Sequence, residues 1–135
     1  MFFKSKNNND NLVKVAALLI HAAKIDENYS LLEENLIKQT LLKIGADNSN
    51  IEEIIKDAQK IEENSNQILD FTKEIKNMNE EKKIEIIEAL WRIIYSNKTA
   101  DDYETNLMRR LAGLLYIDSK TMGDIKERIK SENSK

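Results

Sequence analysis

Helix-breaking residues are almost absent from this chain, and that absence constrains its fold more than any other feature. The 135 residues include no proline and only three glycines. Isoleucine recurs at helical intervals, as in Ile51, Ile54, Ile55 and Ile61, whereas a strand would alternate apolar and polar side chains. Because no proline ends a helix here, the helix boundaries must lie at capping residues. The sequence therefore predicts an all-α bundle of about seven helices.

Capping residues divide the chain into these seven predicted helices. In a capping box, a serine or aspartate and the glutamate three residues later each bond the other's backbone N–H. Such pairs are Ser30 with Glu33, Ser49 with Glu52, and Asp101 with Glu104. The other predicted boundaries are Asp10 or Asn11 before a first helix over 12–25, Gly45 after Ile44, Asn79 before a helix through Tyr95, and Asp118 or Ser119 before the last helix. A short fourth helix is expected near 68–75.

Two of these segments, 13–23 and 84–94, are apolar on almost every side. Their only polar residues are Lys14, His21, Glu85, Glu88 and Arg92. A helix with this pattern must be buried on most of its surface, whereas the remaining helices carry only an apolar stripe. We therefore expect the helices near 12–25 and 79–95 to form the inner pair of the bundle.

A shift of 71 residues superimposes the second half of the chain on the first. Predicted caps then coincide with caps, and inner helix with inner helix, without a gap. Matched positions include Leu19 with Leu90, Glu33 with Glu104, and Asp47 with Asp118. This agreement favours an internal duplication with a pseudo-two-fold axis between the inner helices. The alternative is that any two pairs of amphipathic helices align in part.

The composition excludes several classes of function. The net charge of −3, with mixed charges along the chain, provides no basic field for nucleic acid. The lack of cysteine excludes disulfides, thiolate metal sites and cysteine nucleophiles. No signal-peptide pattern and no apolar run of membrane-spanning length occurs. We expect one cytoplasmic domain over 1–135, with flexible ends at 1–10 and 131–135, no membrane insertion, and peripheral membrane association at most.

A unit made of an inner helix, a turn and a glutamate occurs twice. The turn contains Asp26 in the first copy and Asn97 in the second, and a glutamate follows seven positions later, at Glu33 and Glu104. In the second copy the inner helix reads Ala89-Leu90-Trp91-Arg92, and the next helix continues as Leu107-Met108-Arg109-Arg110-Leu111. This arrangement resembles the TerB-like (tellurite-resistance) family, which is related to the N-terminal domain of DjlA co-chaperones. The resemblance covers roughly Leu12 to Ile129.

The resemblance implies an all-α bundle without catalysis, an acidic surface able to bind divalent cations, and a scaffold role in stress response. A protein partner is implied, and no cofactor is required. The chain departs from the family pattern at both turns. The usual Asp-Gly reads Asp26-Glu27 in the first copy and Asn97-Lys98 in the second. These changes weaken any metal site carried over from the family.

The two turns also carry oxygen ligands in their own right. The first offers Asp26, Asn28 and Glu33, and the second offers Asn97 and Glu104. Ligation by oxygen alone suits Ca²⁺ or another divalent cation. Neither turn has the glycine and final glutamate of an EF-hand loop at the required places. The alternative interpretation is that both glutamates only cap their helices.

Single residues add little that favours catalysis. His21, the one histidine, is expected at the solvent edge or in a hydrogen bond, and no glycine-rich loop is available to hold phosphate. Trp91 and Tyr95 are expected to pack in the core, with a ligand-facing pair as the alternative. Arg109 and Arg110 are expected to pair within their helix, or else to form a small basic spot for a partner.

Two functions from different classes remain. The first is a non-enzymatic TerB-like interaction or scaffold module that binds a divalent cation weakly through its acidic turns. The second is a small-molecule or lipid carrier that uses a cavity between the inner and outer helices.

Overall fold

The computed structural model describes residues 2–24, 31–64, 69–95 and 102–133. These residues form α-helices joined by turns, and no strand occurs in the described ranges. The helices are α1 (Phe2–Lys24), α2 (Leu31–Ile44), α3 (Ile51–Asn64), α4 (Leu69–Ile75), α5 (Glu80–Tyr95), α6 (Asp102–Leu114) and α7 (Ser119–Asn133). The predicted all-α fold of about seven helices is confirmed.

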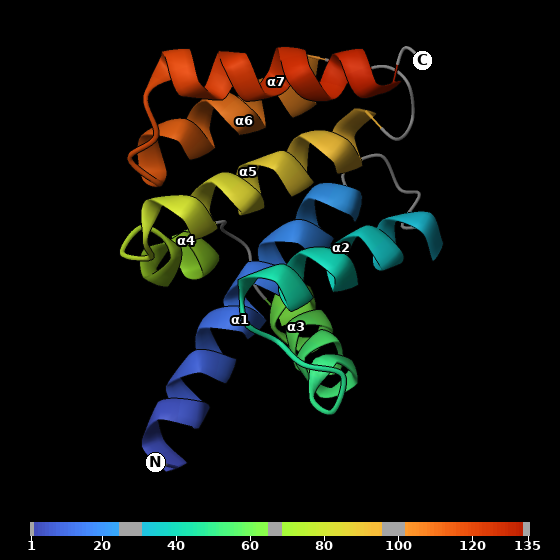
Figure 1. Ribbon diagram of the computed structural model, residues 1–135, viewed down its shortest axis with the longest axis vertical. Helices are drawn as coiled ribbons and strands as arrows, with labels where there is room; N and C mark the ends of the chain where they lie inside the picture. Colours follow the sequence, from blue (N-terminus) through green and yellow to red (C-terminus); the bar gives the residue numbers. More distant parts are fainter. Residues whose placement is uncertain (1, 25–30, 65–68, 96–101, 134–135) are drawn as a thin grey trace.

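Helix α5 lies in the middle of the bundle (Figure 1). It contacts α1 and α2 on one side and α7 on the other. Helix α1 packs chiefly against α3 and α4, and α4 also touches α6. The N-terminal half of α1, in blue in Figure 1, extends away from the other helices. None of the described helices, α1 included, combines the length and apolarity needed to cross a membrane.

The inner pair is the one expected from the sequence. Between Leu12 and Ala23 every side chain is buried except Lys14 and His21, which are half-buried. In α5 the residues from Ile86 to Tyr95 are likewise buried, with two half-buried charged exceptions. The largest fully buried side chains of these two helices are Leu18, Leu19, Ile20, Ile86, Ile87, Leu90 and Ile93. Burial on nearly all sides explains why these segments carry so few polar residues.

The start of α1 differs from the prediction. We expected the first helix to begin at Leu12 behind a cap at Asp10 or Asn11, but α1 begins at Phe2 and includes both residues. Adding residues to an existing helix is far easier than nucleating one, and no proline stands in the way. The helix anchored by the buried segment therefore continues towards the N-terminus. The flexibility expected for 1–10 and 131–135 stays a prediction.

Helix α2 ends as predicted, but the cap of α3 is a different residue. Gly45 has a φ of 136°, and the Ala46 N–H donates to the carbonyl of Leu41 at 2.9 Å, which closes the end of α2. Asp47 Oδ1 then accepts the N–H groups of Ser49 at 2.9 Å and Asn50 at 3.1 Å. Asp47 therefore starts α3, because its carboxylate reaches two free N–H groups that a serine at 49 cannot reach. The predicted Ser49–Glu52 capping box is wrong, and Glu52 instead pairs with Lys38 at 2.8 Å.

The junction between α6 and α7 repeats this arrangement 71 residues later. The Ile117 N–H donates to the carbonyl of Ala112 at 2.9 Å, and Asp118 Oδ1 accepts the Thr121 N–H at 2.7 Å. Tyr116, with a φ of 60°, occupies the place of Gly45. Asp118 is thus confirmed as the start of α7. The matching bonds favour the internal duplication, which stays a prediction. The predicted cap at Asn79 is confirmed too, since its Oδ1 accepts the Lys82 N–H at 2.9 Å.

A buried lysine joins the ends of three helices. Lys83, in the first turn of α5, is 6% exposed. Its Nζ donates to the carbonyl oxygens of Leu115 at 3.1 Å and Lys76 at 3.4 Å, and lies 3.6 Å from Glu80. These carbonyls stand just after the C-termini of α6 and α4, where helix dipoles favour a cation. Lys83 therefore fixes the start of α5 against both helix ends.

Candidate functional sites

Most of the predicted cation site lies outside the described residues. Asp26, Asn28 and Asn97 fall in the ranges 25–30 and 96–101, and Glu104 belongs to α6 without a described side chain. Glu33 is the one predicted ligand whose side chain is described. Ser30 and Asp101, the predicted capping partners of the two glutamates, also lie outside the described ranges.

Glu33 is a buried carboxylate at the beginning of α2. It lies in the first turn of the helix and is only 1% exposed. A carboxylate is costly to bury unless it has a compensating partner, and Glu33 has at least one interaction partner. The positive end of the α2 dipole also favours a negative charge at this place. Its burial suits a helix cap and a cation ligand equally.

The described acidic and histidine side chains, Glu33 included, form no metal-binding cluster among themselves. Within the described ranges, no group of three or more such side chains lies close enough together to hold a metal ion. His21 Nδ1 lies 3.3 Å from Glu62 Oε2, and Glu62 Oε1 accepts a bond from Lys24 at 2.9 Å. The expectation that His21 would be a hydrogen-bonded residue at the solvent edge is confirmed, and its contact joins α1 to α3.

A groove of about 610 Å³ lies between α5, α6 and α7. Its lining is largely apolar and includes two glycines: Trp91, Met108, Arg109, Ala112, Gly113, Ile117, Asp118, Ser119, Met122, Gly123 and Lys126. This volume falls in the range of roughly 300–1,000 Å³ that is typical of small-molecule sites. The groove thus lies between one inner helix and two outer helices, where the carrier hypothesis expected a cavity.

The single tryptophan of the chain lines the groove. Trp91 is 2% exposed and stacks on Tyr95, with ring centroids 5.8 Å apart. Both residues are buried, so their predicted place in the core is confirmed. The indole Nε1 of Trp91 has no hydrogen-bond acceptor in the described part of the chain. Lys126 Nζ lies 5.6 Å from the centre of the indole ring, within reach of a cation–π contact.

The charges that line the groove are two cations and one anion. Arg109 is exposed and Lys126 half-buried, and neither forms an ion pair with a described carboxylate. Asp118 is occupied as the cap of α7, and the Thr121 N–H lowers the pKa of its carboxyl below the usual value. Asp118 is therefore ionised near neutral pH, and the groove keeps a net positive lining. The pairing of Arg109 and Arg110 with acids of their own helix stays a prediction, because the side chains of 102–105 are not described.

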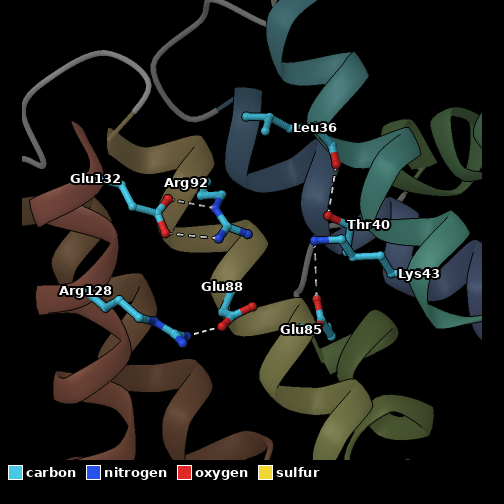
Figure 2. Close-up of polar contacts among 8 residues, drawn as sticks. All are labelled: Leu36, Thr40, Lys43, Glu85, Glu88, Arg92, Arg128 and Glu132. Carbon is cyan, nitrogen blue, oxygen red and sulfur yellow. Dashed lines mark hydrogen bonds and ion pairs between the residues drawn. The ribbon is translucent and has the colours of Figure 1, made fainter. Parts of the chain in front are cut away.

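Ion pairs between α5 and α7 hold one wall of the groove in place (Figure 2). Arg92 donates to both carboxylate oxygens of Glu132 at 3.3 Å, and Arg128 pairs with Glu88, which is 12% exposed at its side chain. On the other side of α5, Lys43 of α2 lies 3.9 Å from Glu85. The charged residues that interrupt the apolar sequence of α5 thus form ion pairs with neighbouring helices. The pairs of Arg92 with Glu132 and of Glu88 with Arg128 fix α7 relative to α5, which carries Trp91.

Comparison with known proteins agrees with the predicted resemblance. The family described as tellurite resistance protein TerB matches the chain over residues 12–127. The chain belongs to the TerB family. Searches of curated proteins and of solved structures give no significant match. The part matched to TerB includes Glu33 and the whole lining of the groove, whereas the relation to the DjlA co-chaperones stays a prediction.

Proposed function

We propose that this TerB-family domain is a non-enzymatic interaction module of a stress response of the tellurite-resistance type. In this role its acidic turns bind a divalent cation weakly and present a surface to a protein partner in the cytoplasm. The observation that carries the proposal is the burial of Glu33, at 1% exposure, inside the region matched to TerB. A buried carboxylate seven residues after Asp26 is a suitable ligand for a hard cation.

The absence of catalysis is part of this proposal. The one histidine of the chain is held by Glu62, and cysteine is absent from the sequence. Because Glu62 holds Nδ1, a nucleophile activated by this histidine would have to meet the other ring nitrogen, Nε2. A binding role makes no such demand.

The partner contact is proposed at the start of α2. Leu31 and Leu32 are 71% and 59% exposed, and they stand directly before Glu33 and Glu34. Apolar side chains beside carboxylates suit a protein segment that carries both apolar and basic residues. The proposed partner is accordingly a basic protein surface.

Thermal unfolding with added metal ions tests the cation part. Saturation with Ca²⁺ at 100 times Kd stabilises a one-site protein by about 2.7 kcal/mol. Glu33→Gln and Asp26→Asn should each reduce this gain, whereas Glu53→Gln, an exposed carboxylate on α3, should leave it unchanged. No shift with millimolar Ca²⁺, Mg²⁺ or Zn²⁺ would remove the cation part and leave the partner part standing.

The partner part has its own test in cells. Leu32→Ser should weaken the phenotype that the intact protein confers, such as tolerance of tellurite, while leaving the melting temperature nearly unchanged. Leu42→Ser, at a less exposed leucine near the other end of α2, is the control. Equal effects of the two variants would contradict a contact at Leu31 and Leu32.

The second candidate function is the small-molecule carrier. The observation that favours it is the groove between α5, α6 and α7, with its mostly apolar lining.

A further inference from the structure

We propose that the groove between α5, α6 and α7 binds a small organic carboxylate with an apolar body. The carboxylate would meet Arg109 and Lys126, and the apolar part would lie against Met108, Ile117 and Met122. The lining does not include Glu33, and it carries the opposite charge preference to a cation site. It gives the carrier hypothesis a specific ligand class.

The indole of Trp91 is the first argument for a ligand. Its Nε1–H is buried and has no acceptor among the described residues. A buried donor without a partner typically costs about 1–3 kcal/mol. Trp91 also lines the groove, and a ligand oxygen beside the ring would accept this bond once the atoms that now cover Nε1 move aside. Packing of the core alone would be served as well by phenylalanine, which carries no such donor.

The charge of the lining is the second and independent argument. Lys126 is held over the Trp91 ring at 5.6 Å, and Arg109 faces the same groove from α6. Neither cation has a carboxylate partner in the described part of the chain, whereas Arg92 and Arg128 on the neighbouring faces do. The one acid of the lining, Asp118, is committed to capping α7. A carboxylate would therefore supply the counter-charge that the groove lacks.

The open space of the groove is created in part by two glycines. A Cβ added at Gly113 or Gly123 would meet no atom within 4 Å. Gly123 lies inside α7, where glycine is less favourable than alanine by about 1 kcal/mol, and Gly113 is the last residue but one of α6. Their presence is therefore not explained by tight packing, and larger side chains there would fill the groove. A volume of about 610 Å³ suits a small molecule rather than a protein domain, which needs a far larger contact.

The single tryptophan makes the site observable in the intact protein. Titration with octanoate should change Trp91 fluorescence in a saturable way, because no other indole contributes to the signal. Octanol, which has the same chain without the charge, should bind at least tenfold more weakly, and octylammonium more weakly still. Equal affinity for octanoate and octanol would overturn the assignment of Arg109 and Lys126. No saturable response to octanoate would overturn the site.

Neighbouring residues provide matched variants. Arg109→Gln should weaken octanoate binding by about tenfold, which corresponds to roughly 1.4 kcal/mol, and should hardly affect octanol. Arg110→Gln removes the same charge from the next position of α6, outside the lining, and should change octanoate affinity less than twofold. Equal losses of octanoate affinity in the two variants would indicate general charge attraction and would contradict the proposal.

A blocking variant tests the place of binding. Gly123→Leu should abolish the response to octanoate while preserving the helical circular dichroism spectrum, since the space beside Gly123 is open. If that variant does not fold, the comparison of octanoate affinity between Arg109→Gln and Arg110→Gln still tests the proposal. Glu33→Gln should leave octanoate binding intact, so failure of the cation proposal and failure of this site are distinguishable.

Discussion

Replacing Lys83 by methionine tests how much one buried cation stabilises the junction of α4, α5 and α6. The substitution keeps an unbranched side chain one atom shorter but removes the donor that meets Leu115 at 3.1 Å and Lys76 at 3.4 Å. Hydrogen bonds from charged groups contribute about 1.5–3 kcal/mol, and the longer bond adds little. Relief from burying the charge offsets part of this loss. We expect Lys83→Met to lower the free energy of unfolding by about 2 kcal/mol.

Thermal and urea unfolding measure that loss. With an unfolding entropy of about 2.1 cal/mol/K per residue, a loss of about 2 kcal/mol lowers the melting temperature of the 135-residue chain by roughly 7 °C. Lys82→Met is the matched control, since Lys82 is the preceding residue of α5 and its side chain forms no ion pair within the described ranges. A loss below about 0.5 kcal/mol for Lys83→Met, or equal losses for both variants, would refute this account of the buried contact.

Three further tests give distinct expected outcomes. Hydrogen bonds from the Ser49 side chain to Asp47 and from the Thr121 N–H to Asp118 lower the pKa of each carboxyl in the folded state. The two carboxylates therefore stabilise the fold at pH values above their unfolded pKa. This stabilisation is lost as the pH falls through their folded pKa. The double variant with asparagine at both positions should therefore lose less stability than the parent chain in acid titrations followed by circular dichroism. Tyr116→Gly should be more stable than Tyr116→Ala by about 1 kcal/mol in urea unfolding, because only glycine adopts the φ of 60° without strain. Glu62→Gln weakens a partner shared by His21 and Lys24 and should lower stability by about 1 kcal/mol in the same assay.

The sequence predicted the helices well because their signals are local. The nearly continuous apolar residues of 13–23 and 84–94 can be satisfied only by burial, and Asn79 and Asp118 carry their capping information in a few neighbouring residues. The start of α1 was missed because the polar run before Leu12 looks unlike a helix, although nothing in it breaks one. The capping-box pattern points to Ser49 and Glu52 and takes no account of Asp47, whose carboxylate caps the N–H groups of Ser49 and Asn50.

The sites were less accessible to sequence reasoning because they depend on tertiary contacts. Lys83 stands in a run of charged residues that is typical of a solvent-exposed face, and only the ends of α4 and α6 make it a buried donor. The groove joins residues from three helices, and its one visible signal was glycine inside two amphipathic helices. The side chain of Glu33 was singled out for its spacing, but its burial followed only from the packing of α2 against α1 and α5.

The central place of α5 has a consequence for how the chain can be divided. A backbone cut between Asn77 and Asn79 would separate α1–α4 from α5–α7, and each fragment would keep one of the main helix pairs, α1 with α3 or α5 with α7. The surface of α5 that contacts α1 and α2 would then be exposed in the second fragment. The matching surface of α1 and α2 would be exposed in the first fragment. Two such fragments, produced apart and mixed, should reassemble into a native-like heterodimer, because each one lacks the apolar cover that the other supplies.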